Sequence, residues 1–202
     1  MNNLDNFYND DPVIFSKSYF GYLAKILNDI DLNEINLFIK VLLEARERDS
    51  QIFFIGNGGS AATASHFAND LSIGVNVFSK PFRALSLTDN VAIISALGND
   101  YGYEEIFVKQ LQVLARPGDI LIGISASGNS PNLIKAFEYA KAMGIWTVGI
   151  TAFEGGRLRK ISDCGIHVPT QNKEYGPAED AHMILDHLVT AYLMRLLRKN
   201  SV

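Results

Sequence analysis

The chain has 202 residues, 48% of them hydrophobic, so it can bury one substantial core, and two independent domains are not expected. A formal net charge of −4 argues against a general basic surface for nucleic acid, and a single cysteine excludes both an internal disulfide and a cysteine-based zinc site. No signal peptide or membrane-spanning run is recognisable, so we expect a soluble protein of the cytoplasm.

The first 48 residues predict a helical extension. Apolar residues recur at helical spacing between positions 15 and 30, and Asp31 with Glu34 resembles a capping pair that opens a second helix. Because these apolar stripes exceed what a solvated arm should expose, we assign residues 1–48 to packing on the core or on another subunit, and we favour a role in oligomerisation. The stripe of the second helix is Ile35, Phe38, Ile39 and Leu42.

Residues 51–71 contain a strand-to-helix junction that fits an anion. A β-rich run passes directly into a helical segment, so backbone N–H groups gather at a helix N-terminus. The lysine of a Walker A loop is absent, which favours a phosphorylated metabolite over hydrolysis of a nucleoside triphosphate. Taken alone, the stretch is also compatible with a tight turn that binds nothing. The junction itself consists of Gly56, Asn57, Gly58, Gly59 and Ser60, whose glycines allow close approach of a ligand and whose serine can bind phosphate.

Residues 82–114 are expected to add further elements of an α/β chain. The pattern predicts a strand at 82–87, a helix at 91–97, a polar loop at 98–102 and a helix at 106–114. The polar loop contains Asn99 and Asp100 between glycines, and it could present them to a ligand or form an ordinary turn.

A second polar junction follows the buried strand expected at 120–124. Its residues 125–132 lead into a helix at 133–143, and Ser130 followed by Pro131 is typical of a helix N-cap with proline in the first turn. A capping role alone would need one serine, whereas the loop also contains Ser125 and Ser127. The loop therefore indicates a second anion cradle, again without lysine.

The remaining strands are expected at 146–150 and 164–168, with a double-glycine turn and a short basic helix between them. Strands that alternate with helices predict an α/β protein with a three-layer, doubly wound parallel sheet. Ligands of such sheets bind beyond the carboxyl ends of the strands, where both polar junctions fall.

The last element is a helix expected from residue 178 to residue 199. It has an apolar face and a basic end, but its beginning is unusual, because ionisable residues crowd there. They are Glu179, Asp180, His182, Asp186 and His187.

Together these motifs resemble the SIS (sugar isomerase) family, and within it the sedoheptulose 7-phosphate isomerases, also called phosphoheptose isomerases. The similarity covers about residues 50–197, so residues 49–202 are identified as a phosphosugar-binding domain of SIS fold. The resemblance implies an enzyme that converts sedoheptulose 7-phosphate to an aldose heptose 7-phosphate through an enediol. It also implies a homotetramer with sites between subunits, and no nucleic-acid or membrane partner is expected.

The same resemblance implies roles for particular residues. Asp70 would be the catalytic base and His187 its acid/base partner, and zinc or another divalent metal would be bound by His66, Asp70, Glu179 and His187. The substrate-binding set would be Asn57, Gly58, Gly59, Ser60, Asp70, Asn99, Asp100, Ser125, Ala126, Ser127, Ser130 and Glu179.

Residue spacing supports this assignment only in part. His66 and Asp70 are four apart and share a helix face, which suits a metal-ligand pair, an acid/base pair or a simple ion pair. Glu179 and His187 are separated by eight helical residues, about 12 Å and a rotation of about 80°, so they need not face one point. Local geometry pairs Glu179 with His182 instead, and we keep His182 as the rival of His187. His167, at a strand end, is expected to be structural.

Three positions depart from the family pattern. Asp70 replaces a glutamate, Glu179 replaces a glutamine and Ala126 replaces a threonine, which leaves the exact substrate open. An alternative function is a non-catalytic phosphosugar-binding regulator, or a tetrameric adaptor of a replication initiator. A third is an enzyme of amino-sugar phosphates, which no residue specifically supports.

Overall fold

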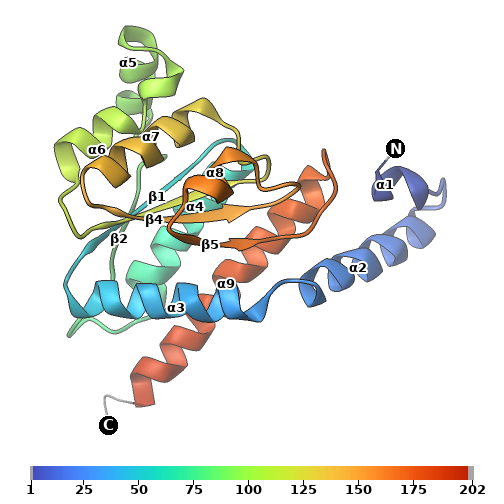
Figure 1. The fold of residues 1–202 in the computed structure, drawn as a ribbon. Coiled ribbons are helices and arrows are strands. Elements are labelled where there is room, and N and C mark those ends of the chain that lie inside the picture. Colours follow the sequence, from blue (N-terminus) through green and yellow to red (C-terminus); the bar gives the residue numbers. More distant parts are fainter. Residues whose placement is uncertain (1, 200–202) are drawn as a thin grey trace.

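The computed structural model describes residues 2–199, and its centre is a sheet of five parallel strands (Figure 1). The order is β2-β1-β3-β4-β5, so the chain winds outward in both directions from β1 and β3, which confirms the expected doubly wound α/β fold. Because the strands are parallel, their carboxyl ends lie along one edge. The strands are β1 (Gln51–Gly56), β2 (Arg83–Ser86), β3 (Ile120–Ser125), β4 (Trp146–Thr151) and β5 (Cys164–His167).

Helices cover both faces of the sheet and make the other two layers. Side chains alternate along each strand, so Ile52 and Phe54 of β1 pack toward one face while Phe53 and Ile55 pack toward the other. The first face is covered by α3 (Leu32–Glu47), α4 (Gly59–Asn69) and α9 (Tyr175–Lys199). The second is covered by α5 (Val91–Asp100), α6 (Val108–Leu114), α7 (Pro131–Ala142) and α8 (Gly156–Ile161).

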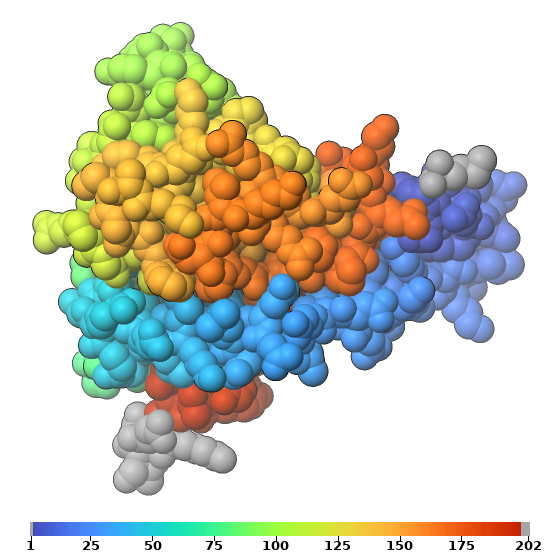
Figure 2. All heavy atoms as spheres, in the orientation of Figure 1, coloured from blue at the N-terminus to red at the C-terminus, as the bar shows by residue number. Residues whose placement is uncertain are grey.

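Residues 2–48, within the expected helical extension, form an arm and a helix that packs on the sheet. Helix α3 is one of the layer helices, because Phe38, Leu42 and Ala45 are completely buried in the core that it shares with the sheet. Only α1 (Asn3–Asn6) and α2 (Pro12–Asn28) stand out to the side, as the dark blue arm in Figures 1 and 2. The apolar stripe of the second predicted helix therefore serves the core of the same chain.

The arm is anchored by one buried carboxylate just before α9. Glu174 is fully buried, and it accepts hydrogen bonds from the backbone N–H of Asn3 (2.7 Å), from the backbone N–H of Gln171 (2.9 Å) and from the hydroxyl of Tyr22. Charge-assisted hydrogen bonds of this kind compensate the desolvation of the carboxylate. They also join α1 and α2 to the beginning of α9.

Two segments differ from the expectation. Residues 98–100 of the expected polar loop are instead the last turn of α5, a helix that is capped at its start by the side chain of Asn90 and ends at Asp100; Gly102, at φ 94°, follows. A short 3-10 turn, η2 (Tyr103–Glu105), follows it. After α4 the chain continues as one π-helical turn, η1 (Asp70–Gly74), in which the Asp70 carbonyl accepts from Val75 N–H at 2.8 Å.

Within residues 2–199, no helix is both long enough and apolar enough to cross a membrane.

The anchor at Glu174 makes a stability prediction. Glu174→Ala removes the acceptor of three buried hydrogen bonds and leaves their donors unpaired, so we expect the free energy of unfolding to fall by roughly 2–4 kcal/mol. The control is Glu154→Ala, at an exposed glutamate in the loop after β4, which should change it by less than about 0.5 kcal/mol. Urea unfolding followed by circular dichroism measures the free energy of unfolding of both variants. Equal losses in the two variants would contradict the role of Glu174 as an anchor.

Candidate functional site

The two polar junctions of the sequence lie side by side in the fold. β1 and β3 are neighbouring strands, so the turns into α4 and α7 leave the same edge of the sheet. The side-chain amides of Asn57 and Asn132 bond each other across the two turns, at 3.0 and 2.8 Å, and the hydroxyl of Tyr103 donates to Asn57 Oδ1 at 2.9 Å. Asn57 therefore holds the two turns together.

Neither α4 nor α7 has its N-terminus capped by the side chain of its N-cap residue. The N-cap of α4 is Gly58, at φ 54°, and the N-cap of α7 is Ser130, whose hydroxyl makes no capping hydrogen bond. A side chain at position 56 is also excluded, because a Cβ there would lie 2.4 Å from the carbonyl oxygen of Ser60. The first turns of both helices thus present backbone donors and hydroxyls to the same region, as an anion requires. We call residues 57–60 and 125–130 the anion cradle.

The serines at 125, 127 and 130 of the anion cradle differ in burial and in hydrogen bonding. Ser125 Oγ accepts from Gly128 N–H at 3.1 Å and shapes the loop, whereas the Ser127 and Ser130 hydroxyls are only partly buried. Ala126 is buried in the core, and its carbonyl accepts from Ala152 N–H at 3.1 Å. Ser127 and Ser130 are accordingly the better candidates for direct contact with a ligand.

Asn99 and Asp100 do not join the cradle. They are exposed on the last turn of α5, which projects away from the sheet in Figure 1, and the Asn99 amide donates to Asp100 Oδ1 at 2.8 Å. In the described part of the chain, no hydrogen bond connects this pair to the other predicted site residues.

A second group of polar side chains lies further along α4, where it contacts α9. His66 Nε2 is 3.1 Å from His187 Nε2, 3.5 Å from Asp70 Oδ2 and 4.0 Å from Asp186 Oδ2. One ligand atom from each of these four residues lies within 4.8 Å of the others, which is the spacing that a shared divalent cation needs. We call His66, Asp70, Asp186 and His187 the four-residue cluster.

Asp186 is the member of the four-residue cluster that was not among the metal ligands implied by the family resemblance. Its carboxylate is completely buried, and neither oxygen makes a hydrogen bond. Burial, and then the nearby charge of Asp70, raise the pKa of Asp186 to about 8. The sequence showed Asp186 within the ionisable start of the last helix, but only the rotation of α9 aims it at His66.

Glu179 stands outside the four-residue cluster, contrary to the expected metal set. Helices α4 and α9 run in the same direction, because Glu179 meets Gly59 at the start of α4 while His187 meets His66 seven residues later. A Cβ at position 59 would lie 2.2 Å from Glu179 Oε2, so this carboxyl group rests directly on the first turn of α4. Burial, and then the charge of Asp180, raise the pKa of Glu179.

His182, the rival of His187, is buried between α9 and the sheet. Neither ring nitrogen makes a hydrogen bond of normal geometry, and burial lowers the pKa of His182 to about 4, against a smaller opposite effect of the Thr151 backbone. His167 lies at the end of β5, where its Nδ1 is 3.1 Å from the hydroxyl of Thr151. Neither His182 nor His167 belongs to the anion cradle or to the four-residue cluster.

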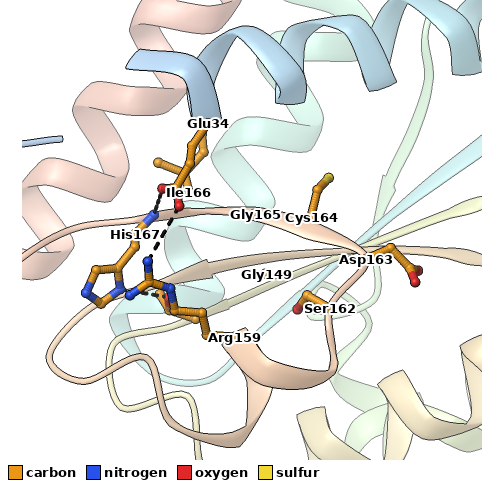
Figure 3. Close-up of a pocket in the computed structure, with 10 residues that line it drawn as sticks. Glu34, Gly149, Arg159, Ser162, Asp163, Cys164, Gly165, Ile166 and His167 are labelled. Atoms are coloured by element: carbon orange, nitrogen blue, oxygen red, sulfur yellow. Dashed lines mark hydrogen bonds and ion pairs between the residues drawn. The ribbon is translucent and has the colours of Figure 1, made fainter. Parts of the chain in front are cut away.

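A hollow of about 230 Å³ at the β5 edge is lined in part by His167, and it shares no residue with the anion cradle or with the four-residue cluster (Figure 3). Its polar groups are paired with one another, since Arg159 is 3.6 Å from Glu34 and the backbone N–H of His167 donates to Glu34 at 2.7 Å. None of the predicted site residues lines it. We therefore place the candidate site along α4 and α9 instead.

Comparison with known proteins finds relatives that cover most of the chain. Residues 18–152 match the sequence model of the SIS domain. The phosphoheptose isomerase of Aneurinibacillus thermoaerophilus is 40% identical over 160 residues, 79% of each chain, and that of Helicobacter pylori strain Shi470 is 38% identical over 151 residues, 75% of this chain and 78% of the other. A solved phosphoheptose isomerase from Francisella tularensis superposes with a TM-score of 0.81 at 27% identity, covering 91% of this chain and 98% of that one.

The buried state of His182 predicts a pH dependence of stability. The unfolded chain binds a proton at this residue near the ordinary pKa of 6.5, whereas the folded chain resists it down to about 4. The contribution of His182 is therefore complete above about pH 6.5, and up to about 3 kcal/mol is lost as the pH falls toward 4. His182→Ala should lower stability at pH 7.5 by about 1–3 kcal/mol, flatten this dependence and leave turnover within about twofold.

Urea unfolding at several pH values measures this effect, with His167→Ala as the comparison. His167 is only half-buried, so its variant should flatten the dependence less. A folded but inactive His182→Ala would make His182, not His187, the working histidine.

Proposed function

The chain belongs to the SIS domain family and, within it, to the phosphoheptose isomerases, and we propose that it converts sedoheptulose 7-phosphate to an aldose heptose 7-phosphate. The observation that carries the proposal is the order of groups along one helix. The anion cradle lies at the start of α4, and His66 follows six residues after Ser60, or roughly 9 Å along the axis. An extended seven-carbon sugar phosphate has a comparable length, so its phosphate and its carbonyl end can contact the two groups together.

The reaction moves one proton between adjacent carbons. A base removes a proton from C1 of the ketose while an acid protonates the carbonyl oxygen at C2, which gives an enediol. Loss of the proton from the C1 hydroxyl and protonation of C2 then give the aldose. In the proposal Asp70 is the base, and His187, exposed beside it, carries the proton to and from the oxygens. Both groups reach the solvent-facing side, where a sugar can approach.

We include a divalent metal, zinc, in the proposal. Imidazole nitrogens and carboxylate oxygens are ordinary zinc ligands, and His66, Asp70 and His187 of the expected set lie within the four-residue cluster. The unpaired buried carboxylate of Asp186 beside them fits a cation, because buried carboxylates are otherwise hydrogen-bonded or paired. When bound, the ion would polarise the oxygens of the sugar.

A homo-oligomer, tetrameric as the resemblance implies, belongs to the same proposal. His66 and His187 are exposed, and the elements that carry them, α4 with its continuation η1 and α9, also expose apolar side chains: Ile73 at 59%, Leu188 at 45% and Tyr192 at 49%. Exposed apolar groups next to a polar site are typical of a subunit interface. A second copy on this face would close the site from water.

The function is tested by a proton NMR time course with sedoheptulose 7-phosphate, with and without a chelator. We expect an anomeric proton resonance of the aldose to appear, to stop with the chelator and to return with added zinc. Binding of the sugar phosphate without any product would instead support a phosphosugar-binding regulator.

The same assay separates the two ends of the site. His187→Ala should lower kcat by about 10²–10⁴-fold with little change in KM, because it removes a proton carrier. Ser130→Ala should mainly raise KM, because it removes one neutral donor from the cradle. An unchanged KM for Ser130→Ala would show that the cradle is misplaced.

The oligomer is tested by placing charge on the apolar face of α9. Leu188→Glu combined with Tyr192→Glu should give a folded monomer with reduced activity, because both carboxylates would be desolvated at the interface. Met143→Glu, at an exposed position after α7, is the control and should leave the mass unchanged. Light scattering gives the mass, and an unchanged mass for the double variant would rule out this interface.

A further inference from the structure

We propose that Tyr103 and Asn132 are positioning residues of the anion cradle, and that they fix the spacing of its two helix starts through the side chain of Asn57. The inference rests on the proposed function for the presence of a phosphate ligand. Neither Tyr103 nor Asn132 is among the substrate-binding residues that the family resemblance implies. Both act through Asn57, so neither has to touch the sugar.

The anion cradle needs a constraint, because it brings two helix N-termini together. Each N-terminus carries the positive end of a helix dipole and backbone N–H groups without partners inside the helix, so the starts of α4 and α7 repel each other. Neither start is capped by the side chain of its N-cap residue. Other groups must therefore hold their spacing when no phosphate lies between them.

Asn132, in the first turn of α7, begins the network that holds the two starts. It is only 2% exposed, and its Oδ1 accepts from the backbone N–H of Leu133 at 3.1 Å. This bond fixes which side of the Asn132 amide is the acceptor. Asn57 Nδ2 then donates to Asn132 Oδ1 at 3.0 Å, and Asn132 Nδ2 donates to Asn57 Oδ1 at 2.8 Å. The backbone of α7 thus sets the orientation of a side chain in the turn before α4.

Tyr103 completes the network from the 3-10 turn η2. Its hydroxyl donates to Asn57 Oδ1 at 2.9 Å, so both lone pairs of that oxygen are occupied. Turn η2 is itself held on α7, because Lys135 pairs with Glu104 at 2.6 Å and with Glu105 at 2.9 Å. Tyr103 remains 59% exposed, so its contribution comes from the hydrogen bond more than from packing.

The network should act on phosphate affinity and not on proton transfer. When the Asn57 side chain is released, the two helix starts lose their fixed separation, and binding of a phosphate then includes the cost of ordering them. Within residues 2–199, the hydrogen bonds of the network do not include His66, Asp70 or His187. Loss of the network should therefore raise KM and leave kcat nearly unchanged.

The experiment measures the binding of inorganic phosphate to the full chain by phosphorus NMR, without sugar, and then KM and kcat for the sugar phosphate. Tyr103→Phe removes only the hydroxyl. Tyr101→Phe is the matched control, because within residues 2–199 the Tyr101 hydroxyl makes no hydrogen bond and its ring faces Lys109. Asn132→Leu keeps a similar volume without the amide, and the double variant tests whether both residues act through Asn57. Thermal unfolding gives the Tm of each variant.

We expect Tyr103→Phe to raise the Kd of phosphate and the KM of the sugar phosphate by about threefold to tenfold. Its kcat should stay within about twofold, and its Tm within about 2 °C, of the parent values. Asn132→Leu should raise both constants by at least about tenfold. In the Asn132→Leu background, Tyr103→Phe should add less than about twofold, because Asn57 is already released. Tyr101→Phe should match the parent.

Parent-like phosphate affinity in Tyr103→Phe would overturn the inference, and so would an equal loss of affinity in Tyr101→Phe. A role limited to folding would lower the Tm of Tyr103→Phe without raising Kd, which would also overturn it. Fully additive effects of the two substitutions would exclude a shared action through Asn57. Should Asn132→Leu not fold, Tyr103→Phe at its exposed position and the Tyr101→Phe control still decide the question.

Absence of phosphate binding by the parent chain would overturn the inference as well. The phosphate titrations need no turnover, so the proton NMR assay with sedoheptulose 7-phosphate decides the isomerase activity separately.

Discussion

Helices α4 and α9 run side by side in the same direction across one face of the sheet, and the candidate site is spread along the line where they meet. The contact from Gly59 to Glu179 at one end and from His66 to His187 at the other sets the register between the helices. A side chain at position 59 would collide with Glu179, so this close approach requires glycine. The register determines which α9 residues can act together with α4.

Three ionisable side chains in or just before α9 are buried. Hydrogen bonds or a shifted pKa compensate their loss of solvation. Glu174 accepts hydrogen bonds from three donors, and it thereby holds the N-terminal arm. His182 stays neutral, as its lowered pKa shows. Asp186 is likewise kept neutral, because burial and the charge of Asp70 raise its pKa to about 8, and its oxygens have no hydrogen-bond partner. Asp186 differs from the other two because it lies among the side chains of the four-residue cluster.

The two ends of the site use different chemistry for a physical reason. The anion cradle offers backbone amides and serine hydroxyls at the starts of α4 and α7, which bind a phosphate without neutralising it completely. The four-residue cluster instead carries groups that accept and release protons or bind a cation. A ligand that spans both ends is held at its phosphate and is reactive at the other end.

The sequence alone determined the fold class, the strand-to-helix junctions and most members of the site. These features depend on local patterns, such as alternating strands and helices, glycines before a helix and the four-residue spacing of His66 and Asp70. The place of α3 in the core, the helical conformation of Asn99 and Asp100, and the position of Asp186 beside His66 came only with the tertiary structure. They depend on how one helix is rotated and shifted against another, which spacing within a single helix does not specify.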